Sequence, residues 1–180
     1  MGFLSSSFVG AVALLIVAAS GSDLQTYKNE NWGFSVTLPS SVRYETSRPP
    51  NPNHGFQVHV SRDSFVWVNA DSSDDLSLSE AVETEKGLWV GQGCREIKRA
   101  PVPLGGRSAE QIQMDCPAGL AQKEVKRVSL IVALQAPPGI NNTAYTVGVA
   151  YPKTGTDEQS ALRTFDAVRQ GFQFNGPELR

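Results

Sequence analysis

Histidine and cysteine are scarce in this sequence, which has two residues of each among its 180. A nucleophilic hydrolase needs a base for its serine, but only His54 and His59 are available and no G-x-S-x-G sequence occurs. The carboxylates that could complete a metal site with these histidines are Asp63, Asp71, Asp74 and Asp75. Their spacing matches no zinc or calcium template. We therefore predict no catalytic, cofactor-binding or metal-binding residue and no cofactor, and interpret both histidines as solvated loop residues.

The sequence also lacks a basic block. It has 16 Lys and Arg residues against 18 Asp and Glu residues, and its net charge is −2. Because phosphate binding needs concentrated basic side chains, we expect no nucleic-acid partner. The acidic residues Glu83 and Glu85 could form a catalytic pair, but they fall on different sides of a helical turn. We expect both of them to face water.

An apolar run lies near the start of the chain, from Phe8 to Ala19. It is shorter than the roughly 20 residues that span a bilayer as a helix, and it ends in small residues of the kind that a signal peptidase accepts, at 18–21. We interpret residues 1–20 as a signal peptide and residues 21–180 as one domain. The protein would then be secreted or periplasmic, with no stable membrane span after cleavage. An uncleaved anchor is the competing interpretation, because residues 1–7 contain no Lys or Arg.

The stretch from Asn31 to Pro39 predicts an early strand. Gly33 introduces it, and Pro39 ends it because proline has no backbone N–H to donate. The alternating residues that indicate a strand with one buried face are Phe34, Ser35, Val36, Thr37 and Leu38. We expect the later strands and both helices to be assembled on this strand.

Two apolar segments, Phe56–Val60 and Phe65–Val68, predict a hairpin. With Arg62 and Asp63 as a two-residue turn, the register places a continuous apolar set on one face of the hairpin. The members of this set are Phe56, Val58, Val60, Phe65 and Trp67. His59 then falls on the opposite face.

A helix is predicted to begin near Ser77, because Ser77 and Glu80 have the spacing of a capping box. Gly91 and Gly93 end it. Its apolar stripe, which could lie on a sheet, consists of Leu78, Ala81, Val82, Leu88 and Trp89.

The second half of the chain predicts two neighbouring strands and a last helix. The most continuous apolar run after the leader, Val125–Ala136, indicates a central strand, and Ala144–Tyr151 returns as its partner. The last helix is expected over Asp157–Gln170, with Thr156 as its cap. Its buried residues and those of the tail after it are expected to be Ala161, Leu162, Phe165, Val168, Phe172 and Phe174. The architecture is α+β, a mostly antiparallel sheet covered by two main helices.

Gly105 and Gly106 predict the turn of another hairpin, because both tolerate the positive φ angles of a tight turn. In this register Ile97 lies opposite Met114.

Cys94 and Cys116 are predicted to form a disulfide, since their number is even, no C-x-x-C occurs and we expect export. The hairpin register leaves them one residue short of facing each other. Facing Cα atoms on adjacent antiparallel strands stand roughly 4.5–5.5 Å apart, within disulfide range. We therefore expect a bulge in the incoming arm, which contains Pro101 and Pro103, to bring both side chains to one face. A thiol site is the alternative.

Three short motifs resemble the PsbP-like family. The segment 32–39 is similar to the opening strand of that family, 104–109 resembles its Gly- and Ala-containing turn, and 165–172 looks like its C-terminal helix. Members include an extrinsic subunit of photosystem II, a nuclear Ran-binding protein and secreted bacterial proteins of unknown function. The resemblance implies a PsbP-like α+β fold used for docking and accessory roles. This chain departs from the family in having its own cysteine pair, and no position matches a family binding site.

The sequence leaves more than one class of function open. We expect an exported, non-enzymatic binding or accessory module of the cell envelope, a monomer that docks an unknown protein or small ligand. The alternatives are a hydrolase or metal-dependent enzyme with an unrecognised site, and a purely structural export protein. The segment Lys123–Arg127 is either a solvated strand start or a docking patch, and Asn141 begins a glycosylation sequon that matters in a eukaryote.

The leader gives the first prediction. We expect the exported protein to lack residues 1–20, because a signal peptidase would cut after the small residues that end the apolar run. Mass spectrometry of the intact mature protein should therefore show a chain that starts near Gly21. A mature chain that starts at Met1 would instead support the anchor.

Overall fold

The computed structural model describes residues 23–46, 54–117, 126–135, 142–153 and 156–175. The predicted signal peptide at residues 1–20 and Asn141 lie outside these ranges. The elements in chain order are β1 (Leu24–Asn29), β2 (Phe34–Pro39), β3 (Glu45–Thr46), β4 (Gly55–His59), β5 (Phe65–Ser73), α1 (Leu78–Val90), β6 (Arg95–Leu104), β7 (Arg107–Cys116), β8 (Lys126–Gln135), β9 (Asn142–Pro152), α2 (Glu158–Gly171) and β10 (Phe172–Phe174). The predicted α+β class is confirmed.

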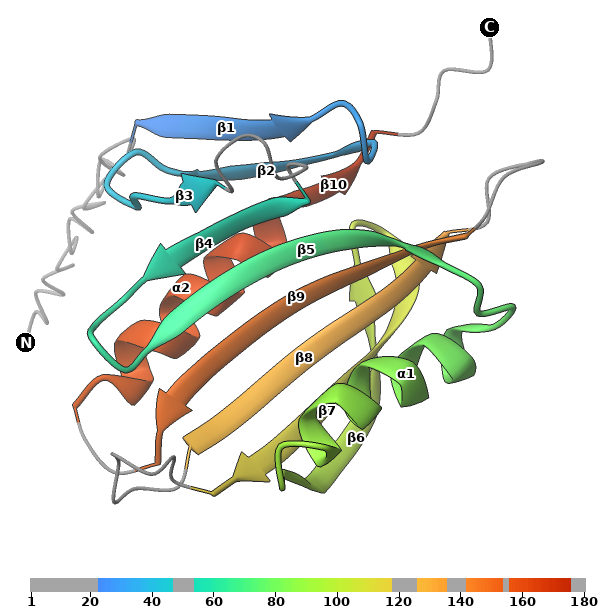
Figure 1. Cartoon of the computed structure of the whole chain (residues 1–180). Coiled ribbons are helices and arrows are strands. Elements are labelled where there is room, and N and C mark those ends of the chain that lie inside the picture. Colours follow the sequence, from blue (N-terminus) through green and yellow to red (C-terminus); the bar gives the residue numbers. More distant parts are fainter. Residues whose placement is uncertain (1–22, 47–53, 118–125, 136–141, 154–155, 176–180) are drawn as a thin grey trace, which may run out of the picture.

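The strands form two sheets (Figure 1). The large sheet has seven strands in the order β3-β4-β5-β9-β8-β7-β6, and the small one has three in the order β1-β2-β10. Every pair in both sheets is antiparallel. The run at Val128–Ala133 is buried throughout, so β8 is an interior strand with both faces covered, as its continuous apolar sequence predicts.

One face of the large sheet is covered by α2 and the small sheet together (Figure 1). The helix buries Ala161, Phe165 and Val168, and it packs on β9 and β2. Aromatic rings fill the space where the small sheet meets the large one. The rings of Phe34 and Phe172 stack with their centroids 5.4 Å apart. This apolar layer joins both ends of the described chain to the large sheet.

The opposite face of the large sheet carries α1, which packs mainly on β7 and β8. Its predicted capping box is present: the Ser77 hydroxyl accepts a hydrogen bond from the backbone N–H of Glu80, and the Glu80 carboxylate accepts one from the backbone N–H of Ser77. Ala81 and Val82 are fully buried against the sheet. Leu88 was expected in the buried stripe but is 61% exposed, so that part of the expectation is wrong.

The strand at Phe34–Pro39 forms as predicted, but its expected role is wrong. It is the central strand of the small sheet, and the large sheet with α1 is built separately from it. Its edge partner β1 was not predicted, because β1 is a mostly polar segment with only two buried residues, Tyr27 and Asn29. The other partner, β10, comes from the end of the chain.

The predicted register of the β4–β5 hairpin is wrong by one residue. The structure pairs His59 with Phe65 and Gln57 with Trp67, so residues 60–64 form a five-residue loop. A shift of one residue moves side chains to the other face of a sheet. Phe65 and Trp67 consequently lie on the α1 face, opposite to the face where Val58 is buried.

The second hairpin turns at Gly105 and Gly106, which have φ angles of 53° and 80°. Pairing shifts between Glu96 and Lys98, so Met114 lies opposite Glu96 and the expected pairing with Ile97 is wrong. The shift is the bulge that the cysteine spacing predicts for this arm. With its two prolines, β6 lies at the edge of the sheet.

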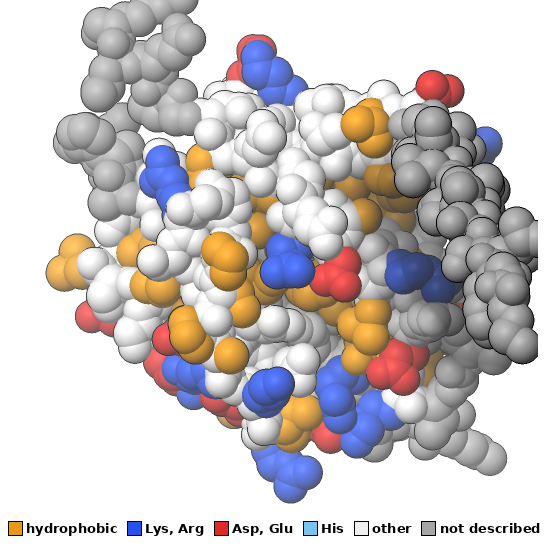
Figure 2. Space-filling view, turned by 180° about the vertical axis from the view of Figure 1, so that it is seen from behind, with side chains coloured by type: hydrophobic (Ala, Val, Ile, Leu, Met, Phe, Trp, Pro, Cys, Tyr) orange, Lys and Arg blue, Asp and Glu red, His pale blue; other side chains and the backbone are white. Residues whose placement is uncertain are grey.

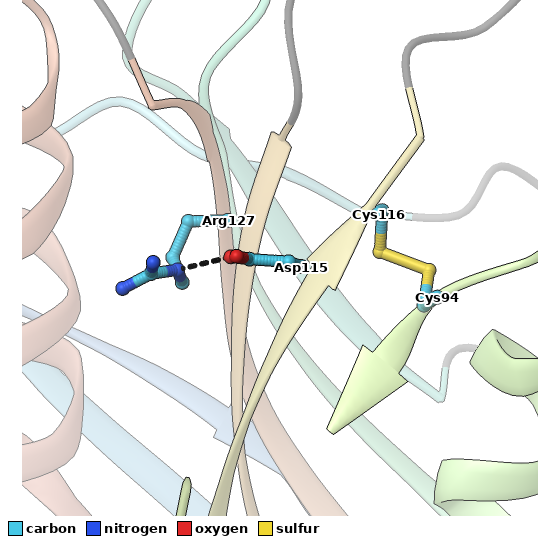
Figure 3. Close-up of a disulfide and its surroundings, with 4 residues drawn as sticks. All are labelled: Cys94, Asp115, Cys116 and Arg127. Carbon is cyan, nitrogen blue, oxygen red and sulfur yellow. Dashed lines mark hydrogen bonds and ion pairs between the residues drawn. A yellow bond between two sulfur atoms is a disulfide. The ribbon is translucent and has the colours of Figure 1, made fainter. Parts of the chain in front are cut away.

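The predicted disulfide between Cys94 and Cys116 is present, with Cα atoms 4.0 Å apart (Figure 3). It joins the segment after α1 to the end of β7. The neighbouring Asp115 side chain points away from the bond, toward Arg127 of β8, and their ion pair is 2.7 Å long. Burial acts to raise the pKa of Asp115, but hydrogen bonds from Lys153 and Arg127 outweigh it and lower the pKa.

The last helix is capped differently from the prediction. Its N-cap is Asp157, and this residue makes no side-chain capping bond. Of the expected buried residues, Ala161, Phe165, Val168 and Phe172 are buried, whereas Leu162 and Phe174 are partly buried. The tail pairs as β10.

The disulfide gives the second prediction. The double variant Cys94→Ala, Cys116→Ala should lose about 3 kcal/mol of unfolding free energy, because the bond restricts the unfolded chain over a separation of 22 residues. Urea unfolding of the oxidised protein and the variant would measure the difference. The oxidised protein treated with a reductant serves as a control and should behave like the variant. Free thiols titrated in the unfolded, unreduced mature protein would contradict the bond.

Candidate functional site

A groove lies on the α1 face of the large sheet, where the helix leaves β4, β5 and β9 uncovered. It has a volume of about 560 Å³, within the range of ligand-binding clefts. The sheet contributes its floor and one helix face its wall. Its floor includes Gln57, Phe65, Trp67, Asn69 and Thr146. Its wall consists of Glu85, Leu88, Trp89 and Gln92. Glu45 and Thr46 of β3 lie at its outer edge.

The wall follows from helical spacing. Glu85, Leu88 or Trp89, and Gln92 recur at intervals of three and four residues, which places them along one side of a helix and its last turn. The adjacent side, with Ala81 and Val82, is buried on the sheet. The helix therefore presents one side to the core and the next side to the groove.

Aromatic rings are the main apolar feature of the groove. The ring centroids of Phe65 and Trp67 are 5.3 Å apart, and those of Trp67 and Trp89 are 5.8 Å apart. All three side chains are only partly buried. Since Trp67 belongs to β5 and Trp89 to α1, the pair also links the helix to the floor. Partly exposed tryptophans next to a cleft are typical of binding surfaces.

The position of Trp67 depends on a glycine in the neighbouring strand. Gly148 of β9 is the register partner of Trp67. A Cβ atom at Gly148 would overlap the six-membered ring of the Trp67 indole. The absence of a side chain at Gly148 therefore lets the indole lie across β9 toward the helix.

Glu85 was expected to face water, and that expectation is wrong. Its carboxylate lines the groove and accepts a hydrogen bond from Thr146, whose side chain is buried. Burial raises the pKa of the Glu85 carboxyl, the bond from Thr146 opposes this, and the negative charges of Asp71 and Asp75 raise the pKa further. Glu83, by contrast, lies outside the groove, where it forms ion pairs with Lys86 and Arg99.

The polar groups of the groove favour ligands with hydrogen-bond donors. Gln57, Asn69 and Gln92 supply amide groups, and Glu85 and Glu45 supply carboxylates. Among the described residues that line the groove, there is no Lys, Arg or His. The site can therefore combine apolar contact with hydrogen bonds and negative charge.

The histidines are placed differently from each other. His59 is exposed, as predicted. His54 is not a solvated loop residue: its side chain is 26% exposed, its Nδ1 atom donates to the carbonyl oxygen of Ala70 at 2.8 Å, and its ring lies 5.0 Å from that of Trp32. His54 thus has a structural position between the two sheets, with Asp71 3.5 Å away.

Of the carboxylate candidates for a metal site, Asp71 lies beside His54, but this pair alone does not make a metal site. Within the described part of the chain, no three His, Cys, Asp or Glu side chains form a group that could hold a metal ion. Asp75 instead accepts hydrogen bonds from Ser73 and Thr84. Of the segment Lys123–Arg127, only Lys126 and Arg127 are described, and Arg127 is held by Asp115.

On the α2 side, basic, acidic and hydrophobic side chains are interspersed over the part of the face that grey atoms leave visible (Figure 2). Neither helix of the described chain has the length and hydropathy to cross a membrane. The groove beside α1 is consequently the site on which we base the function.

No family model and no curated protein matches the sequence. Solved structures match its fold. LpqN, involved in cell envelope biogenesis of Mycobacterium tuberculosis, aligns with a TM-score of 0.59 at 10% identity, covering 86% of this chain and 86% of LpqN. Cyanobacterial PsbP (CyanoP) from Synechocystis sp. PCC 6803 aligns with a TM-score of 0.54 at 15% identity, covering 92% and 98%. The Saccharomyces cerevisiae Ran-binding protein Mog1p aligns with a TM-score of 0.51 at 12% identity, covering 86% and 96%.

The chain therefore has the PsbP-like fold, as its three short motifs predicted. At these identities the likeness shows the fold alone. The role of the groove residues therefore has to be inferred from the contacts that they make in this protein.

Sequence reasoning missed the groove because Phe65 and Trp67 were assigned to the wrong face. One signal was available. Gln57 and Asn69 alternate with buried apolar residues in the same two strands, which indicates that the second face is polar and open. On such an open face, a partly exposed tryptophan such as Trp67 would be expected to bind a ligand.

Gly148 gives the third prediction. Gly148→Ala should displace the Trp67 indole, lower the melting temperature and shift the tryptophan emission to longer wavelength, because the added methyl group takes the place of the ring. Gly87→Ala in α1 is the matched control, since nothing lies within 4 Å of its added Cβ. This control should raise the stability by about 0.5–1 kcal/mol, the usual gain for replacing a helical glycine. An unchanged emission in Gly148→Ala would contradict the packing.

Proposed function

We propose that this protein is an exported, non-enzymatic accessory module of the cell envelope that binds a partner protein in the groove beside α1. In this proposal residues 1–20 are removed and residues 21–180 act as one domain. The observation that carries the proposal is the row of partly exposed aromatic rings, Phe65, Trp67 and Trp89, in a cleft with amide and carboxylate groups. Aromatic side chains that a partner can desolvate supply much of the binding energy of protein interfaces.

Two further observations support the setting. The Cys94–Cys116 disulfide is the kind of bond that persists in oxidising compartments outside the cytoplasm. Among proteins with the same fold, LpqN is described as involved in cell envelope biogenesis, and Mog1p is described as a Ran-binding protein. A binding role suits a fold that has been put to several uses.

The rim of the groove favours a macromolecular partner. Leu88 stands on the helix wall with 61% of its surface exposed. This side chain extends the apolar surface of the cleft onto the outside of α1. A polypeptide that enters the groove could cover it, whereas a small ligand would leave it in water.

Site-specific photo-crosslinking in the source organism tests this proposal. A benzoylphenylalanine at position 88 should crosslink one discrete partner protein, and the additional change Trp67→Ala should abolish that product. The control position is Leu76, which is 86% exposed and does not line the groove. Crosslinker at position 76 should not give the product. Melting temperatures of all variants would show that each is folded.

The proposal fails if position 88 gives no product, or if the product persists unchanged without Trp67. It also fails if the purified protein turns over a substrate and His54→Ala or His59→Ala removes that activity. The latter result would favour an enzyme.

A further inference from the structure

The groove carries an excess of negative charge that its own residues do not neutralise. Glu85 and Glu45 are the charged residues among the described lining, and Asp71 and Asp75 lie near enough to Glu85 to act on its ionisation. Within the described chain Glu85 has no Lys, Arg or His in ion-pair contact. The neutral hydroxyl of Thr146 lies near enough to act on the pKa of Glu85, which it lowers.

Two other half-buried carboxylates of this protein, Asp115 and Glu96, are paired with cations, whereas Asp75 near Glu85 is held by the hydroxyls of Ser73 and Thr84. Asp115 is held by Arg127 at 2.7 Å and by Lys153 at 2.9 Å. Glu96 of β6 is held by Arg99 at 2.9 Å. A partly buried carboxylate normally has such a partner, because desolvating an unpaired charge is costly. Glu85 lacks a cation where the fold supplies one elsewhere.

The apolar part of the groove also suits a cation. The face of an indole attracts an ammonium or guanidinium group through the quadrupole of the ring, and tryptophan is the strongest side chain in this respect. Trp67 and Trp89 line the groove together with Glu85, and their ring planes are tilted by only 30°. A planar guanidinium can lie over such a surface and still donate hydrogen bonds to a carboxylate at its edge.

We propose that the partner inserts an arginine side chain into the groove, with the guanidinium over the indoles of Trp67 and Trp89 and its charge against Glu85. This proposal rests on the proposed function and specifies its partner as a protein with an exposed basic segment. Charge complementarity selects the arginine, and the apolar rim at Leu88 selects a polypeptide over a free cation. The amides of Gln57, Asn69 and Gln92 remain available for the backbone of the segment.

The inference accounts for a carboxylate that does not stabilise the free protein. A carboxyl whose pKa is raised in the folded state favours folding most below its ordinary pKa of about 4.5, and that contribution is lost as the pH rises through the raised value. Removal of the charge should therefore help the free protein at neutral pH. Glu85→Gln should melt at a higher temperature than the wild type at pH 7, and the difference should shrink as the pH falls through the raised pKa of Glu85 toward 4.5.

Binding of designed peptides to the purified protein tests the proposal. The probe is a capped peptide with the sequence Gly-Leu-Arg-Leu-Gly, and its matched control carries citrulline, which has the same shape without the charge. Calorimetry and tryptophan emission would follow the titration. We expect the citrulline peptide to bind at least about tenfold more weakly, which corresponds to about 1.4 kcal/mol. Increasing salt should weaken only the arginine peptide.

Variants identify the groups that bind the arginine. Glu85→Gln and Trp67→Phe should each reduce affinity for the arginine peptide by about fivefold or more, while leaving the citrulline peptide less affected. Glu83→Gln is the matched control, because Glu83 is on the same helix outside the groove. It should bind both peptides like the wild type. Arginine amide alone should bind at least about tenfold more weakly than the peptide.

Three results would overturn the inference. They are equal affinity for the two peptides, no effect of Glu85→Gln, and binding of arginine amide as tightly as the peptide, which would make a small cation the ligand. If any of these occurs while the crosslink from position 88 still depends on Trp67, the groove binds a protein by other chemistry and the proposed function stands. If the crosslink is absent as well, both proposals fail.

Discussion

A helix is narrower than a seven-stranded sheet, and the strands that it leaves uncovered determine where this protein has an open binding surface. Strands stand about 4.8 Å apart and a helix with its side chains is about 10 Å wide, so one helix covers roughly two strands. The large sheet has seven strands, and α1 packs mainly on β7 and β8. On the opposite face, α2 and the small sheet together cover the large sheet. Among the described elements, none besides α1 covers β4 and β5 on this face, and the groove is the space that α1 leaves open.

The side chains follow this unequal coverage strand by strand. In β8, which has elements on both sides, the residues from Val128 to Ala133 are all buried. In β5 the side facing α2 buries Val66, Val68 and Ala70, while the side facing the groove carries partly exposed aromatic and amide residues. The open face is thus neither an ordinary solvated surface nor a core. A surface of this kind retains apolar area that a partner can bury.

Much of the fold could be predicted from the sequence, because the signals for it are local. The capping box at Ser77, the Gly105–Gly106 turn and the apolar run of β8 each depend on a few neighbouring residues. The disulfide was predictable from the even number of cysteines and the hairpin spacing, and the bulge followed from it, because the hairpin register leaves Cys94 and Cys116 one residue short of facing each other. The small sheet was not, since β2 takes one partner from a polar segment and the other from the end of the chain.

The groove could not be predicted because it depends on a register that differs from the expected one by one residue. A two-residue turn at Arg62 and Asp63 and the observed five-residue loop use almost the same sequence, but they place Trp67 on opposite faces. Long-range packing determines which of the two registers forms. Trp67 pairs with Gly148, which lies 81 positions later and leaves room for the indole. No local pattern in either strand contains that information.

The same reasoning explains why fold and function separate in this protein. Identities of 10–15% to LpqN, PsbP and Mog1p are enough to preserve the order of strands and helices, because many apolar residues can fill the same core. A groove has stricter requirements. Replacing Gly148 or Glu85 would leave the sheet and both helices in place, yet it would change the shape or the charge of the cleft. Proteins with this fold can therefore bind unrelated partners while their backbones remain superimposable. For this chain, the carboxylate of Glu85, which has no cation partner and lines the same groove as Trp67 and Trp89, is the feature that the fold does not require and that a ligand would.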